Sequence, residues 1–99
     1  MTQKAQTVSE ALRRAQEEEE DVFLARLNKQ ELEKSGFDTS TFGEFSVVDV
    51  YLQYWDGEFT LKYEFDDDPR QTYYEKENEV GGRDMLLEIV EEYLDLGGE

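Results

Sequence analysis

The sequence has 99 residues, a length typical of one domain with a small hydrophobic core. It carries 26 acidic and 10 basic residues, and this net charge of −16 disfavours direct binding to nucleic acid or to an anionic membrane. Cysteine and histidine are absent, which excludes disulfides, cysteine-based zinc sites and histidine-based acid–base catalysis. We therefore expect a single domain over residues 1–99, with a flexible start at residues 1–7.

The first predicted element is a helix over residues 8–35. Thr7 and Glu10 match a capping box, in which the Thr7 side chain accepts from the third helical residue. Apolar residues then recur at helical spacing as far as Leu32, and Ser35-Gly36 provides a stop signal. Four consecutive glutamates at 17–20 interrupt the apolar face, so two alternatives stay open: one long helix, or two shorter ones.

Residues 45–65 predict a β-hairpin with Asp56-Gly57 at its turn, because this dipeptide tolerates the positive φ angles of a type I′ turn. The two-residue loop sets the register of strands at about 44–55 and 58–65. In this register four apolar pairs share one face: Val48–Phe65, Val50–Tyr63, Leu52–Leu61 and Tyr54–Phe59. The other face holds the polar pairs Asp49–Glu64, Tyr51–Lys62, Gln53–Thr60 and Trp55–Glu58. A shift by one residue would destroy this sorting, so the pattern specifies the register.

Two further elements follow the hairpin. Pro69 ends the second strand, and residues 71–77 predict a short third strand that pairs antiparallel with it. Apolar residues from Met85 to Leu94 recur at helical spacing, so a final helix is expected over about 83–96, before Gly97-Gly98. The predicted fold is α+β, with helices packed in two layers on one face of a three-stranded antiparallel meander.

The negative charge is concentrated in the second half of the chain. Residues 1–48 have a net charge of −4 and residues 49–99 one of −12, and Asp84–Glu99 holds six acids and no base. Carboxylates in the last turn of a helix oppose its dipole, so stability alone would favour lysine there. Tyrosine and tryptophan on the polar hairpin face are residue types enriched at the energetic centres of interfaces. We therefore predict a partner-binding surface that consists of Asp49, Tyr51, Trp55, Glu58, Glu64, Asp66, Asp67, Asp68, Glu75, Glu77, Glu88, Glu91, Glu92 and Asp95.

No catalytic motif is present, and we expect no enzyme activity and no cofactor. The run Asp66-Asp67-Asp68 is better explained as a turn before Pro69 than as a metal site, because no calcium-loop spacing follows it. The chain contains no signal-peptide core and no apolar run of about 18 residues, so we expect a soluble, cytoplasmic protein.

The predicted helix–three-strand–helix order and the heavy acidity broadly resemble some phage-encoded anti-CRISPR proteins, and also small immunity proteins and antitoxins that neutralise basic nucleases. The resemblance covers architecture and charge, and no site residues are transferred from it. It implies a small acidic inhibitor that binds a basic protein surface, in its sharpest form a nucleic-acid mimic that blocks the cleft of a DNA- or RNA-handling protein. The alternative is a structural module that forms a homo-oligomer, such as a homodimer, through its sheet face, with the acidity serving solubility or salt tolerance.

Overall fold

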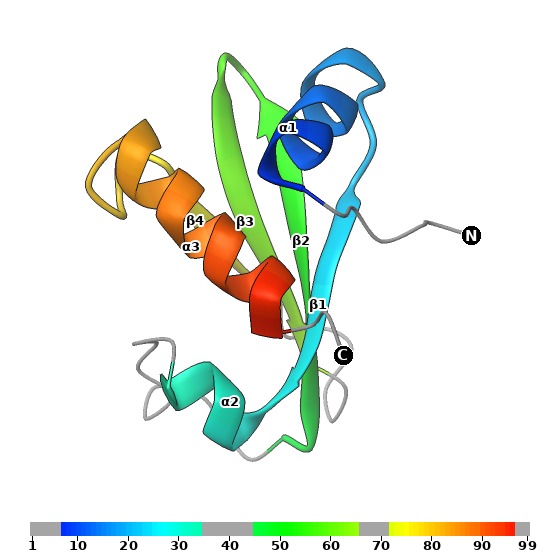
Figure 1. Cartoon of the computed structure of the whole chain (residues 1–99), viewed down its shortest axis with the longest axis vertical. Coiled ribbons are helices and arrows are strands. Elements are labelled where there is room, and N and C mark those ends of the chain that lie inside the picture. Colours follow the sequence, from blue (N-terminus) through cyan, green and yellow to red (C-terminus); the bar gives the residue numbers. More distant parts are fainter. Residues whose placement is uncertain (1–6, 35–44, 66–71, 97–99) are drawn as a thin grey trace.

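The computed structural model describes residues 7–34, 45–65 and 72–96, and Figure 1 shows their arrangement. The fold is α+β, and its antiparallel sheet has the strand order β1-β2-β3-β4. The elements are α1 (Val8–Glu17), β1 (Val22–Asn28), α2 (Lys29–Lys34), β2 (Val47–Trp55), β3 (Glu58–Phe65), β4 (Thr72–Lys76) and α3 (Arg83–Leu96). The predicted three-stranded meander is therefore corrected to a sheet of four strands.

The central hairpin has the predicted register. All eight pairs between β2 and β3 are as expected, from Val48 opposite Phe65 to Trp55 opposite Glu58. At the turn, Asp56 has a φ of 53° and Gly57 a φ of 84°, which are the positive values that a type I′ turn requires. Strand β4 and helix α3 also lie where the sequence predicts them, at Thr72–Lys76 and Arg83–Leu96.

The N-terminal region differs from the prediction, because residues 22–28 form strand β1 instead of continuing a helix. Strand β1 pairs with β2, with Val22 opposite Leu52 and Leu27 opposite Val48, and a β-bulge lies between Phe23 and Ala25. The bulge inserts Leu24 as an extra residue and breaks the two-residue alternation of the strand. The buried positions 22, 24, 25 and 27 consequently lack a strict strand period, while Val22 and Phe23 continue the helical spacing of Val8, Leu12 and Ala15.

Helix α1 ends at Glu17 because an ion pair turns the following chain back onto it. The side chain of Arg14 is buried and donates to Glu20, beyond the helix end, and to Glu10, one turn before it. The hydrogen bond from Arg14 to Glu20 is the main reason that the pKa of Arg14 is raised, while burial acts against it. Glu20 therefore follows the turn instead of extending the helix, and three of the four glutamates, Glu18, Glu19 and Glu20, lie outside any element.

Helix α2 is a separate, short helix with its own start signal. Asn28 Oδ1 accepts from the Glu31 backbone N–H at 2.8 Å, and Glu31 Oε1 accepts from the Asn28 N–H at 2.9 Å. This reciprocal pair starts the helix directly after β1. Leu32 is its buried residue and joins the main core.

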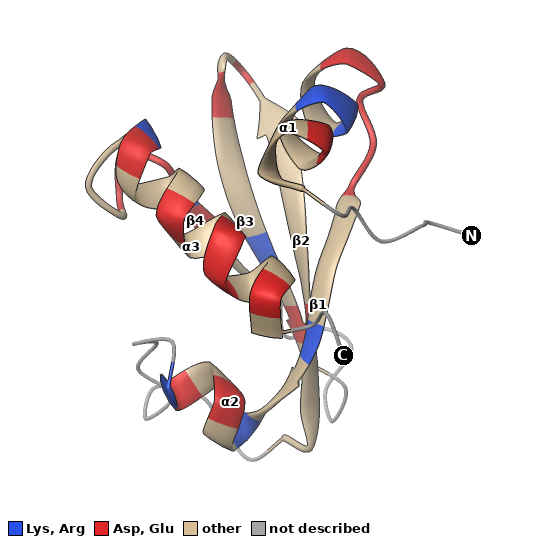
Figure 2. Cartoon of the chain, in the orientation of Figure 1, with Lys and Arg blue, Asp and Glu red and all other residues tan. Residues whose placement is uncertain are grey.

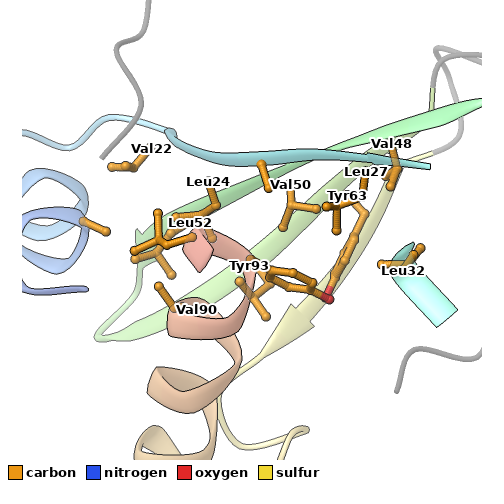
Figure 3. Packing of buried hydrophobic residues seen from close by; sticks show 14 of the residues in the cluster. Val22, Leu24, Leu27, Leu32, Val48, Val50, Leu52, Tyr63, Val90 and Tyr93 are labelled. Atoms are coloured by element: carbon orange, nitrogen blue, oxygen red, sulfur yellow. The ribbon is translucent and has the colours of Figure 1, made fainter. Parts of the chain in front are cut away.

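The core lies between the sheet and the three helices, which all pack against the same sheet face (Figure 3). The strands contribute the apolar hairpin residues together with Val22 and Leu27 of β1, and the helices contribute Ala11, Leu32 and Val90 among others. The opposite sheet face is covered by none of the described helices, and we call it the open face. No helix in the described part of the chain is long and apolar enough to cross a membrane.

We expect Gly57→Ala to lower the free energy of unfolding by about 1 kcal/mol, because alanine is strained at positive φ. No atom lies within 4 Å of a Cβ added at Gly57, so this loss would come from the backbone alone. Urea unfolding measures it, and Gly57→Asn should lose less because asparagine tolerates this conformation. Equal stability of Gly57→Ala and the parent protein would contradict the assigned turn.

Candidate protein-binding site

Helix α3 has an apolar side and an acidic side. Its buried residues Leu86, Val90, Tyr93 and Leu94 face the core. Its exposed acids recur every three or four residues, and at about 100° per residue they fall within an arc of about 100° on the other side. We call these residues, Asp84, Glu88, Glu91, Glu92 and Asp95, the acidic stripe. Figure 2 shows acidic residues recurring along the whole of α3, with a basic residue only at its start.

The carboxylates of the acidic stripe have no cationic partner among the described residues. The one base of α3, Arg83, is bound to Glu77, and the last turn of the helix contains no base. Like charges four residues apart, such as Glu88 and Glu92, cost about 0.2–0.5 kcal/mol, and the acids near the C-terminus also oppose the helix dipole. The acidic stripe therefore lowers the stability of α3 itself, and the packing of the apolar side of α3 against the core offsets this loss.

A buried tyrosine pair attaches α3 to the sheet. The hydroxyl groups of Tyr93 on α3 and Tyr63 on β3 lie 2.7 Å apart, and Tyr63 donates to Glu75 Oε1 on β4 at 3.2 Å. Both rings are nearly fully buried and meet edge to face, with their centroids 6.1 Å apart. Burial raises the pKa of Glu75, the Tyr63 hydroxyl acts against this, and the charge of Glu79 raises it further. This chain of contacts fixes the rotation of α3 and keeps the acidic stripe on the outer side.

A second attachment lies at the start of α3. The Arg83 guanidinium donates to both oxygens of Glu77, at 2.8 and 3.0 Å, and lies 5.0 Å from the centre of the Phe59 ring. Glu77 Oε1 also accepts from the Phe59 backbone N–H at 3.1 Å. The hydrogen bond from Arg83 holds the pKa of Glu77 below its ordinary value, burial opposes this shift, and the Phe59 N–H supports it. Glu77 therefore holds the start of α3 against strand β3, because it binds Arg83 and the backbone of Phe59 at the same time.

The acidic stripe borders an open groove of about 900 Å³ between α3 and the start of α1. One wall holds four carboxylates of the stripe, and the other holds Thr7, Val8 and Ser9. Leu94 adds apolar surface, and Thr7 caps α1 by accepting from the Glu10 N–H at 3.1 Å. The groove thus combines apolar and hydroxyl-bearing surface with a dense row of negative charge.

The structure does not bring the predicted hairpin residues together with the acidic stripe. Asp49, Tyr51, Trp55, Glu58 and Glu64 alternate onto the open face, whereas α3 packs on the opposite face. Two of these acids also have cationic partners on that face. Arg26 donates to both oxygens of Asp49, at 2.7 and 3.1 Å, and Lys62 lies 3.0 Å from Glu64.

The remaining predicted residues divide into two groups. Glu75 and Glu77 carry out the structural contacts described above, so we leave them out of the binding surface. Asp66, Asp67 and Asp68 lie outside the described residues. Within the described residues, no group of three or more acids could hold a metal ion.

Three features of these surfaces were missed from the sequence. Arg26 neutralises Asp49 only because 22–28 is a strand, and the β-bulge concealed that strand. Asp21 reaches across to Lys62 at 3.3 Å, a contact that also depends on β1. The groove beside α3 has no local signal, since it forms between two helices about 80 residues apart in the chain.

Comparisons with protein-family models, with curated proteins and with solved structures found no match. The functional argument therefore depends on the geometry and charges of the chain itself.

We expect Glu75→Gln to raise stability near neutral pH, because glutamine can still accept from Tyr63 without placing a charge in a half-buried position. The folded pKa of Glu75 is raised, so its stabilising contribution is complete below the ordinary value of 4.5 and is lost as pH rises through the folded pKa. The advantage of the variant should accordingly grow with pH. Thermal unfolding at several pH values measures it, with Glu88→Gln as the control for removal of one negative charge. An advantage that shrinks as pH rises would contradict the assignment.

Glu77→Gln should lower the free energy of unfolding near neutral pH by about 1–2 kcal/mol, because it removes charge-assisted hydrogen bonds from a buried acceptor. The folded pKa of Glu77 is lowered, so its contribution is present above the ordinary value of 4.5 and is lost as pH falls through the folded pKa. The difference between the two proteins should therefore disappear in acid. Urea unfolding tests this, with Glu58→Gln on the open face as the control. Equal losses of unfolding free energy in both variants would contradict the structural role of Glu77.

Proposed function

We propose that this protein is a small acidic inhibitor or adaptor that binds a basic surface of another protein through the acidic stripe. The observation that carries the proposal is that five carboxylates of one helix occupy one exposed arc, and none of them is paired with a cation of the described residues. A role in solubility would not require this grouping, and the grouping costs helix stability. A basic partner would supply the missing counter-charges.

The finer form of the proposal is mimicry of a nucleic-acid backbone. Asp84 and Asp95 are eleven residues apart, which is about 16 Å along an α-helix. Five charges over this length are about 4 Å apart along the helix axis, close to the 3.4 Å of duplex axis that each phosphate of one DNA strand occupies. The cleft of a nuclease or another nucleic-acid-binding protein would meet a similar density of negative charge here.

The groove beside the stripe suits long basic side chains. The stems of lysine and arginine are apolar and cover apolar surface while their charged ends reach polar groups. Val8 and Leu94 can contact such a stem, and Glu91 and Asp95 can receive its charged end. Arginine is favoured at such a site because its planar guanidinium binds a carboxylate through two parallel hydrogen bonds.

We expect the double charge reversal Glu91→Lys with Glu92→Lys to weaken partner binding at least tenfold and leave the fold intact, because both residues are exposed. The measurement is an affinity pull-down from the source cell, with identification by mass spectrometry and circular dichroism to check the fold. Captured proteins should also be released by added duplex DNA or by raised salt, which shortens the Debye length from about 10 Å at 0.1 M to about 3 Å at 1 M.

The matched control is Glu17→Lys with Glu19→Lys, which changes the net charge equally at exposed acids away from α3. This control should retain the partner. Equal capture by the two double variants would count against a site on α3. Capture that resists DNA but responds to salt would support a basic partner and reject nucleic-acid mimicry.

A further inference from the structure

The open face carries a row of side chains that crosses all four strands. Phe23 of β1 lies opposite Tyr51 of β2, Tyr51 opposite Lys62 of β3, and Lys62 opposite Tyr74 of β4. The side chain of Tyr74 is 49% exposed, and Trp55, at the end of β2 on the same face, is 75% exposed. No described helix covers this row, whereas most apolar side chains of the other face are buried.

Contacts within the row hold three of its four members, Phe23, Tyr51 and Lys62, in place. The rings of Phe23 and Tyr51 meet edge to face with centroids 5.7 Å apart, and the Lys62 ammonium lies 5.7 Å from the centre of the Tyr51 ring. Lys62 is further restrained by Asp21 at 3.3 Å and Glu64 at 3.0 Å. A partner that docks here would meet ordered aromatic surface, so little side-chain entropy would be lost on binding.

The open face also differs in charge from the rest of the molecule. Its described charged residues are four acids, Asp21, Asp49, Glu58 and Glu64, and three bases, Arg26, Lys62 and Lys76. Their sum is −1, whereas the whole chain has a net charge of −16. A strongly basic partner would gain little electrostatic attraction from this face, and a strongly acidic partner would gain little as well. The face suits a partner that is itself mixed in charge and aromatic.

We propose that the open face binds a second copy of this chain, sheet against sheet, as a two-fold symmetric dimer. In such a dimer the same patch faces itself, so it must be complementary to itself. A two-fold axis along the strands between β2 and β3 would place Tyr51 against Lys62 of the other copy and Phe23 against Tyr74. Aromatic pairs and cation–π contacts would then form across the interface.

The size of the face is compatible with a dimer. The four strands contain 29 residues, and at about 3.3 Å along and 4.8 Å across per residue they cover roughly 450 Å². Two such faces give roughly 900 Å² in projection, and side chains enlarge the accessible area beyond this plane. This approaches the lower limit of about 1,000–1,200 Å² for specific interfaces, so we expect a dimer of modest affinity.

Salt separates this dimer from binding through the acidic stripe. Two chains of charge −16 repel each other at long range, and the interface has almost no net charge to offset the repulsion. Raising salt from about 0.1 M to about 1 M should therefore strengthen the dimer, whereas it weakens binding between the stripe and a basic partner. The stripe lies on the side of the sheet away from the interface, so either proposal can fail without the other.

Sedimentation equilibrium of the full chain tests the proposal. At about 0.5 mM protein we expect a dimer whose dissociation constant falls as salt rises. The double variant Trp55→Ser with Tyr74→Ser should raise that constant at least tenfold, because exposed aromatics contribute most at such interfaces. A monomeric mass at this concentration in high salt would overturn the proposal.

The matched control is Met85→Ser on α3, because Met85 is 47% exposed, like Tyr74, and uncharged. It should change the dissociation constant less than about twofold. Circular dichroism shows whether each variant is folded. If the double variant is unfolded, the single variant Tyr74→Ser takes its place in the measurement. A dimer that the Met85 change weakens as much as the Tyr74 change, or that salt dissociates, would place the interface elsewhere and refute the proposal.

Discussion

The register of the β2–β3 hairpin is the constraint on which the other features of this structure depend. The positive φ angles of Asp56 and Gly57 set a two-residue turn, and the turn determines which residues of the two strands face each other. Strands β1 and β4 then pair with the outer edges of this hairpin. Because side chains alternate between faces, one turn thereby decides which residues pack under the helices and which lie on the open face.

The sheet separates two surfaces that differ in charge. On the helix side, the Tyr63–Tyr93 contact and the Glu77–Arg83 pair hold α3 so that its acidic stripe points away from the core. On the open face, bases from β1 and β3 compensate the hairpin acids. The excess negative charge of the chain is therefore distributed unevenly, and the two faces suit partners of different chemistry.

Sequence patterns predicted the hairpin and α3 because both are governed by local rules. The hairpin has a turn dipeptide and eight consistent pairs, and α3 has an unbroken helical period from Met85 to Leu94. Strand β1 was missed because Val22 and Phe23 continue the helical spacing of Val8, Leu12 and Ala15, and because the bulge at Leu24 interrupts the two-residue alternation of the strand. The error extended to the candidate site: with β1 read as a helix, Arg26 was not available to neutralise Asp49, and the hairpin acids seemed continuous with those of α3.

The sequence by itself determined the overall charge, which is a matter of composition, and also the central register and the acidic stripe, since these two follow from neighbours within one hairpin or one helix. Only the tertiary structure decided which acids are free to bind. Glu75 and Glu77 look like other surface acids in the sequence, yet Tyr63 and Arg83 bind them. Asp49 and Glu64 have cationic partners only when the strands align. Whether a carboxylate is free depends on the groups within about 4 Å of it, and for these four residues tertiary contacts supply those groups.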